Sequence, residues 1–178
     1  MSIINTERLT IRHVVADDWK SIKDIWVDFN SSALSQYDKP HITDDADVQP
    51  RIAKWAAANS GTEHMFFAVC LDDTVIGYIL FNEAAEGVYE MGWIYNRRFW
   101  RQGYAYESCK AVIDYAFTEL NAHKVFVEAI DTMKSVSLMQ KLGMQLEGIQ
   151  RSQTKDNHGN WADLYFYGLL EDEWRKDK

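Results

Sequence analysis

Three short apolar runs, at residues 64–71, 74–83 and 86–96, are the feature that most constrains the fold of this chain. Each run has the length of a strand, and aspartate or glycine turns separate them. Runs of this kind are typical of β-strands, so they predict a hairpin followed by a third strand. A segment with apolar side chains at helical spacing, residues 104–122, comes next. A sheet and at least one helix must therefore share a core.

The rest of the chain repeats these two periodicities. Further strands are expected within 6–14, 123–131, 145–154 and 162–171, and further helices within 16–30, 38–61 and 134–144. The order β-α-α-β-β-β-α-β-α-β-β predicts an α/β protein of the α+β type, a mixed, mostly antiparallel sheet of six to seven strands flanked by about four helices. A length of 178 residues is enough for one core, so a single domain over residues 1–178 is expected.

Charge and composition exclude several classes of function. Nineteen basic against 27 acidic residues give a net charge of -8, which argues against a nucleic-acid partner and is compatible with a cationic substrate. The two cysteines and five histidines lack the spacing of metal ligands, so no metal is expected. Neither a signal peptide nor an apolar run long enough to span a membrane is present, and the cytoplasm is the expected location. The surplus of aromatic residues is compatible with a homodimer face.

The stretch NRRFWRQGYAYES, residues 96–108, places basic side chains and a glycine in front of the predicted helix. Helix N-termini carry unpaired N–H groups and a partial positive charge, and glycine lets an anion approach the backbone. The stretch therefore predicts a phosphate-binding loop whose donors are the main-chain amides of Gln102, Gly103, Tyr104 and Ala105, with charge from Arg98 and Arg101. A solvated basic loop is the alternative, because neither GxxxxGK[ST] nor GxGxxG occurs.

A longer run around this loop, YEMGWIYNRRFWRQGYAYESCKAVIDYAF, carries a family resemblance together with TERLTIRHVVADDW, KSVSLMQKLGMQLEG and GNWADLYFYGLLEDEW. The run resembles the acetyl-CoA signature of the GNAT superfamily of N-acetyltransferases. It is most similar to the RimJ/RimL-like branch, which includes the ribosomal-protein N-terminal acetyltransferases. The four stretches follow in register and cover nearly the whole chain.

The resemblance implies a GNAT fold whose third strand and the strand at 123–131 run parallel and splay apart. The backbone of Trp93, Ile94 and Tyr95 would then bind the pantetheine arm of the co-substrate acetyl-CoA as an added strand does. The amides of residues 102–105 would hold its pyrophosphate. The family's Asn-x-x-Ser motif places Thr132 and Ser135 beside the cofactor, with threonine in place of the asparagine.

The implied reaction is direct attack of an amine on the thioester. Glu90 is the candidate base, because it lies on the strand that leads to the thioester; a solvated carboxylate is the alternative. Ser135 is the candidate that hydrogen-bonds the leaving thiolate, and a helix N-cap is its alternative role. The tyrosine that many members use as general acid falls at Met139, which cannot donate a proton.

The acceptor amine is the least defined part of the sequence-based prediction. Trp26, Phe29 and Tyr37 are expected on the substrate side, as are Trp161 and Asp163, although core and hairpin packing are the alternatives. Three functions stay open: acetylation of a protein N-terminal α-amine, acetylation of a small amine such as a polyamine, amino acid or antibiotic, and non-catalytic acyl-CoA binding. Neutralising an α-amine at pH 7 costs about 1 kcal/mol, against about 4–5 for a lysine-like amine, which favours the first.

Overall fold

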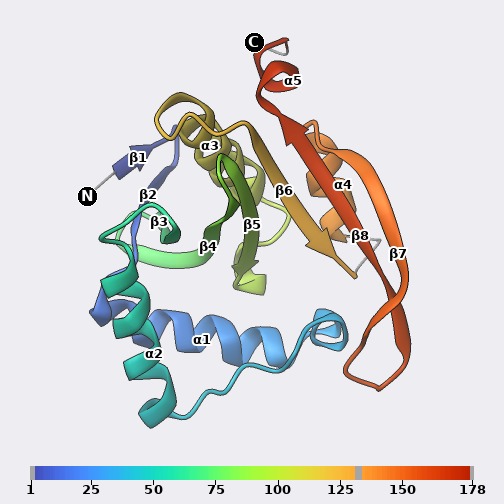
Figure 1. The fold of residues 1–178 in the computed structure, drawn as a ribbon. Helices are drawn as coiled ribbons and strands as arrows, with labels where there is room; N and C mark the ends of the chain where they lie inside the picture. Colours follow the sequence, from blue (N-terminus) through green and yellow to red (C-terminus); the bar gives the residue numbers. More distant parts are fainter. Residues whose placement is uncertain (1–2, 131–133, 177–178) are drawn as a thin grey trace.

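The computed structural model describes residues 3–130 and 134–176, with nothing described of the Lys134 side chain. Within that part of the chain one sheet contains eight strands in the order β1-β2-β3-β4-β5-β6-β8-β7 (Figure 1). Its strands are β1 Ile3–Asn5, β2 Leu9–His13, β3 His64–Leu71, β4 Thr74–Ala85, β5 Val88–Tyr95, β6 Lys124–Ala129, β7 Gln145–Lys155 and β8 Trp161–Leu170. The helices are α1 Trp19–Asn30, α2 Asp45–Ala58, α3 Tyr104–Thr118, α4 Lys134–Lys141 and α5 Glu171–Lys176, with short 3-10 turns η1 Ala16–Asp18, η2 Ala33–Tyr37 and η3 Arg97–Phe99.

The predicted fold class is confirmed: the sheet is mixed, its β5–β6 pair is parallel, and the other neighbouring strands pair antiparallel. The strand expected within residues 6–14 is observed as β2, and it forms the second arm of a hairpin with β1, in which Thr6 turns the chain. The Thr6 amide donates to the Leu9 carbonyl at 2.9 Å, and the Leu9 amide donates to Thr6 Oγ1 at 3.0 Å. This extra arm and the short α5 account for the additional elements.

Helices cover both faces of the sheet and divide its core into two clusters. Helix α1 presents a buried stripe at helical spacing, made of Ile22, Ile25, Trp26 and Phe29. With α2 it packs on the face of the sheet to which Tyr78 contributes, whereas α3 and α4 pack on the opposite face, to which Met91 and Tyr95 contribute. Alternate residues of β4 and β5 thus serve different helix layers.

The parallel pair β5–β6 is short and opens into a gap. Its register runs from Val88 opposite Lys124 to Glu90 opposite Phe126, and no further pair forms between the two strands where they are described. Strand β6 nevertheless stays paired with β8 as far as Ala129, so the sheet divides between β5 and β6 (Figure 1). This is the splay that the resemblance implied.

The β7–β8 hairpin extends from this divided side to η2. At its tip the Asn157 amide donates to the Gln36 carbonyl at 2.8 Å, and the Asn157 side chain donates to the carbonyls of Ser35 and Asp38. These contacts join two parts of the chain that are more than 115 residues apart. Separately, none of the described helices is long and apolar enough to cross a membrane.

Candidate active site

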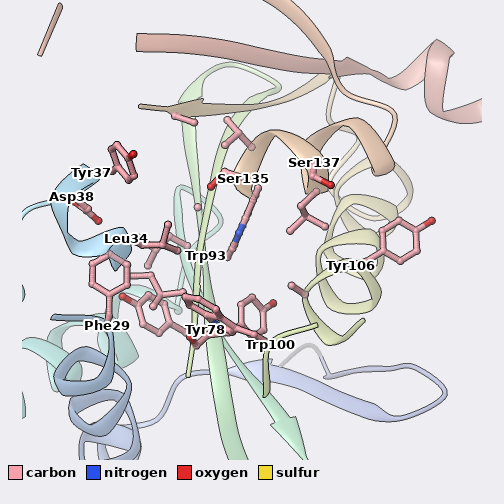
Figure 2. Close-up of a pocket in the computed structure, with 18 of the residues that line it drawn as sticks. Phe29, Leu34, Tyr37, Asp38, Tyr78, Trp93, Trp100, Tyr106, Ser135 and Ser137 are labelled. Carbon is pink, nitrogen blue, oxygen red and sulfur yellow. Dashed lines mark hydrogen bonds between the residues drawn. The ribbon is translucent and has the colours of Figure 1, made fainter. Parts of the chain in front are cut away.

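A cavity of about 890 Å³ lies at the gap between β5 and β6. Strands β4, β5 and β6 contribute to its wall, together with α1, η2, α3 and α4. Figure 2 shows Phe29 and Leu34 on one side of Trp93, with Ser137 and Tyr106 on the other. The two helix layers therefore meet one cavity from opposite faces of the sheet.

The α3 side of the cavity presents an open helix N-terminus. The N-cap is Gly103, with φ 85°, and because glycine has no side chain, none caps the helix; Arg101, two residues earlier, also has a positive φ of 60°. In the part of the chain that the structure describes, the main-chain N–H groups of Gln102, Gly103, Tyr104 and Ala105 have no protein acceptor. Unpaired amides at a helix N-terminus can bind an anion, which is the role that the sequence predicts for this loop.

The N-terminal hairpin supports this loop from behind. The Arg8 guanidinium donates to the Gln102 carbonyl at 2.9 Å and forms an ion pair with Glu107 at 2.6 Å. Burial raises the pKa of Glu107, but hydrogen bonds from Thr6 and Arg8 outweigh it and lower the pKa overall. The carboxylate thus stays charged in the first turn of α3, which favours helix formation.

A second set of contacts ties the loop to β5. The indole of Trp100 donates to the Tyr95 carbonyl at 2.8 Å, and the Tyr95 hydroxyl lies 2.6 Å from Ser108 Oγ on α3. Tyr95 is buried, and Gly77 on β4 makes room for its ring: a Cβ at Gly77 would lie 2.2 Å from Tyr95 Cδ1. The strand that ends at the cavity and the helix that begins there are thereby held together.

Most of the residues predicted to bind the cofactor line the cavity. They are Trp93, Ile94, Tyr95, Arg101, Gly103, Tyr104, Ala105 and Ser135. Arg98 and Gln102 do not line it, and the side-chain amide of Gln102 donates to the Arg98 carbonyl at 3.0 Å. Thr132 lies outside the described residues.

Two carboxylates lie on the side of the cavity opposite the α3 N-terminus. Glu90 lines the cavity as predicted, and Glu128 on β6 joins it. The parallel register places both side chains on the same face of the sheet. Partial burial, and then the negative charge of Glu90, raise the pKa of Glu128. The sequence analysis missed Glu128; its signal was an acidic residue alternating with Val125 and Val127 in an apolar strand.

Helix α4 brings Ser135 to the wall, whereas Met139 is fully buried in the core. Position 139 therefore supplies no proton donor, as expected for a methionine side chain. Lys141 at the end of α4 also lines the cavity and was missed by the sequence analysis. Cys109 lies in the core under α3, where burial raises the pKa of its thiol to about 12, so it is packed rather than nucleophilic.

Of the five residues expected on the acceptor side, Phe29 and Tyr37 line the cavity. Trp26 is 1% exposed, because it faces the core between α1 and β4. Trp161 is 65% exposed near the hairpin tip, and Asp163 accepts a hydrogen bond from the Ser152 amide at 2.8 Å inside the same hairpin. Leu34, Asp38 and His41, from η2 and the segment after it, complete the acceptor wall.

Charge is divided between the two sides of the cavity. The cofactor side carries Arg101 and Lys141, and the acceptor side carries Asp38, Glu90 and Glu128. Such a site can hold an anion at one end and an ammonium group at the other. Among the described residues, no cluster of three or more His, Cys, Asp or Glu side chains is placed to hold a metal ion.

Comparison with known proteins gives a consistent result. A family model described as an acetyltransferase (GNAT) domain matches residues 8–145. The chain is 32% identical over 176 residues to YnaD of Bacillus subtilis (strain 168), called an uncharacterized N-acetyltransferase, covering 96% of this chain and 98% of that protein. The crystal structure of a GNAT-family acetyltransferase from Bacillus anthracis matches with a TM-score of 0.83 and 26% identity, over 96% and 99% of the two chains. RimL, a ribosomal L7/L12 alpha-N-protein acetyltransferase in complex with coenzyme A, matches with a TM-score of 0.87 at 16% identity, over 97% and 99%.

Proposed function

Because the chain belongs to the GNAT family of acetyl-CoA-dependent N-acetyltransferases, we propose that it acetylates the α-amine of a protein or peptide N-terminus, as the RimJ/RimL-like branch does. One observation carries the proposal. A single cavity at the β5–β6 gap has unpaired main-chain amides on one side and two carboxylates on the other. A thioester held in the gap would thus meet an amine that enters from the opposite face.

The cofactor side fits acetyl-CoA as co-substrate. The amides of residues 102–105 would bind the diphosphate, each charge-assisted hydrogen bond contributing about 1.5–3 kcal/mol, and Arg101 and Lys141 would add positive charge. Beyond Glu90 the edge of β5 that faces β6 is unpaired, which leaves main-chain groups for the pantetheine arm. Ser135 on α4 would hydrogen-bond the sulfur as the thiolate leaves.

On the acceptor side, Glu90 and Glu128 would attract the ammonium form of the amine. Glu90 would take its proton, directly or through a water, to expose the lone pair that attacks the thioester. Partial burial and the charge of Glu90 raise the pKa of Glu128, so Glu128 takes up a proton more readily than an ordinary glutamate does. Deprotonation of an α-amine with a pKa near 7.8 costs only about 1 kcal/mol at pH 7. A pair of carboxylates in the cavity can meet this small cost.

A small cationic amine such as a polyamine is the second candidate acceptor. The three carboxylates of the acceptor wall favour it, since a polyamine carries additional positive charges. The peptide is preferred because the fold neighbour RimL acts on an α-amine of a ribosomal protein. We also propose a cytoplasmic location, because the unpaired thiols of Cys70 and Cys109 are typical of a reducing compartment.

Release of free thiol from acetyl-CoA, measured across peptides and small amines, tests the proposal. Turnover on peptides with a free N-terminus and none on their N-blocked counterparts would support it. Turnover restricted to polyamines would select the second candidate, and tight acetyl-CoA binding without turnover on any amine would refute both.

The variant pair Glu90→Gln and Glu128→Gln assigns the base. Glu90→Gln is expected to lower kcat about 100-fold or more, within the range for a lost general base, while acetyl-CoA affinity stays the same. Glu128→Gln is the matched control, with a smaller loss. A rate unaltered by Glu90→Gln would remove Glu90 from the mechanism.

A further inference from the structure

The hydroxyl of Tyr78 on β4 has a hydrogen for which the described residues offer no acceptor. The side chain is 2% exposed, and its oxygen accepts a hydrogen bond from the indole nitrogen of Trp26 at 2.8 Å. An indole N–H can only donate, so the hydroxyl must point its own hydrogen elsewhere. Within residues 3–130 and 134–176 that hydrogen has no acceptor. A buried donor without a partner is uncommon in folded proteins and calls for an explanation.

The free hydrogen belongs to a side chain of the cavity wall. Tyr78 lines the cavity near Phe29 (Figure 2). Its ring is fixed by Trp26 and by Trp55, whose ring centroid lies 5.4 Å away. Burial raises the pKa of Tyr78 well above its ordinary value, so the hydroxyl stays protonated and can act only as a neutral donor. A rigid donor of this kind is suited to recognising a ligand oxygen.

A second polar atom in the same part of the wall is also without a partner. Nε2 of His41 is buried and makes no hydrogen bond in the part of the chain that the structure describes. The imidazole stacks on Trp26 with ring centroids 5.0 Å apart, and Asn30 fixes the His41 backbone through hydrogen bonds of 2.7 and 2.9 Å. The wall beyond Phe29 is therefore held in place and yet incompletely hydrogen-bonded.

The sheet register places Tyr78 relative to the proposed base. Tyr78 lies opposite Ile94, and Glu90 lies opposite Asn82, so the two are four residues apart along the β4–β5 ladder and on the same face. At about 3.3 Å per residue this is about 13 Å. Gly92 lies midway, and a Cβ built there would meet nothing within 4 Å. An amine near Gly92 would have Glu90 about 7 Å away on one side and Tyr78 about 7 Å away on the other, each within reach of its side chain.

We propose that the Tyr78 hydroxyl donates a hydrogen bond to a carbonyl oxygen within the first two residues of the acceptor, and thereby selects amines that carry a nearby carbonyl. An extended peptide advances about 3.5 Å per residue, so its first two carbonyls span the distance from Gly92 to Tyr78. A polyamine offers no acceptor atom and would leave the hydroxyl unpaired. This inference rests on the proposed function, since it assumes that the acceptor amine enters from the α1 side.

A parent peptide and two analogues that each differ from it in one atom test this contact. A short peptide with a free N-terminus is compared with two analogues in which the first or the second carbonyl is a thioamide, whose sulfur is a weaker acceptor. At saturating acetyl-CoA the wild-type protein is expected to favour the parent peptide over one analogue by about 3- to 10-fold in kcat/KM. In Tyr78→Phe that ratio should fall to about one. A wild-type ratio near one for both analogues, or a ratio that Tyr78→Phe leaves unchanged, would overturn the proposal.

Trp26→Phe is the matched control, because it removes the other half of the Trp26–Tyr78 hydrogen bond and leaves the hydroxyl in place. Trp26→Phe is expected to keep the wild-type ratio of kcat/KM between the parent peptide and its thioamide analogue. Loss of this ratio in Trp26→Phe would show that packing of the cavity wall, and not the Tyr78 hydroxyl, sets the preference for the parent peptide. If Tyr78→Phe is poorly folded, the double variant Trp26→Phe/Tyr78→Phe leaves no unpaired indole and gives the same readout. Thermal unfolding and acetyl-CoA affinity are measured for each variant.

The outcomes separate this inference from the proposed function. Turnover of amino-acid amides but not of peptides would refute the peptide assignment, and the carbonyl contact would still be decided on an amide and thioamide pair. Turnover confined to polyamines would overturn both.

Discussion

Replacement of Gly103 by alanine tests the anion site at the start of α3. Gly103 has φ 85°, a conformation that costs an L-residue about 1–2 kcal/mol. The added Cβ would also lie 3.2 Å from Nη2 of Arg8, the side chain that holds the loop from behind. Relief of either strain must shift the amides of residues 102–105. We therefore expect Gly103→Ala to lower both the stability of the fold and its affinity for acetyl-CoA.

The two effects are separable by thermal unfolding with and without acetyl-CoA. For a chain of this length a loss of 1–2 kcal/mol lowers Tm by about 2–8 °C. Loss of one of the charge-assisted amide contacts weakens acetyl-CoA binding about tenfold or more. At a concentration of 100 times the wild-type Kd, acetyl-CoA stabilises the wild-type protein by about 2.7 kcal/mol, and a tenfold weaker variant by about 1.4.

Gly159→Ala is the matched control. Gly159 has φ 80° at the β7–β8 turn, and a Cβ there would meet nothing within 4 Å. It should show the same intrinsic strain with an unchanged response to acetyl-CoA. If Gly103→Ala keeps the full ligand-induced rise in Tm, the amides of this loop do not bind the cofactor and the reasoning fails.

Three other perturbations probe the frame around the cavity. Glu107→Gln should lower the free energy of unfolding by about 1 kcal/mol at pH 7. Because folding lowers the pKa of Glu107, the difference in unfolding free energy between wild type and variant should shrink as the pH falls below about 4.3 towards the folded pKa. Chemical denaturation at several pH values measures this difference. In Gly77→Ala the added Cβ would overlap the buried ring of Tyr95, so the free energy of unfolding from denaturant titrations should fall by about 1–3 kcal/mol or more. Gly61→Ala places its Cβ in open space, and its unfolding free energy should fall far less. Asn157→Ala removes the side-chain contacts between the hairpin tip and η2, so KM for the acceptor should rise about 3- to 10-fold with acetyl-CoA affinity unchanged; a shift in both, or in neither, would contradict a role confined to the acceptor wall.

Local sequence patterns determined much of the cofactor half of the site. The basic stretch with Gly103 predicted an open helix N-terminus, and the loop has that form because glycine tolerates the positive φ that the turn requires. On the acceptor side, the family resemblance drew attention to Glu90 on the strand that leads to the thioester, and Glu90 lines the cavity. Both signals are contained within a few consecutive residues.

The acceptor half depends on contacts between distant residues, which no local pattern specifies. Glu128 joins Glu90 only through the parallel register of β5 and β6, and the Asn157 side chain reaches η2 across more than 115 residues. Helical spacing predicted that Trp26 lies on an apolar stripe of α1. Packing against the sheet turns Trp26 towards the core, and residues of η2 line the cavity in its place. The sequence by itself determined which segments form strands, helices and the anion loop; strand register and the packing of the two helix layers decided which side chains share the cavity, because periodicity records a residue's face and not what lies across from it.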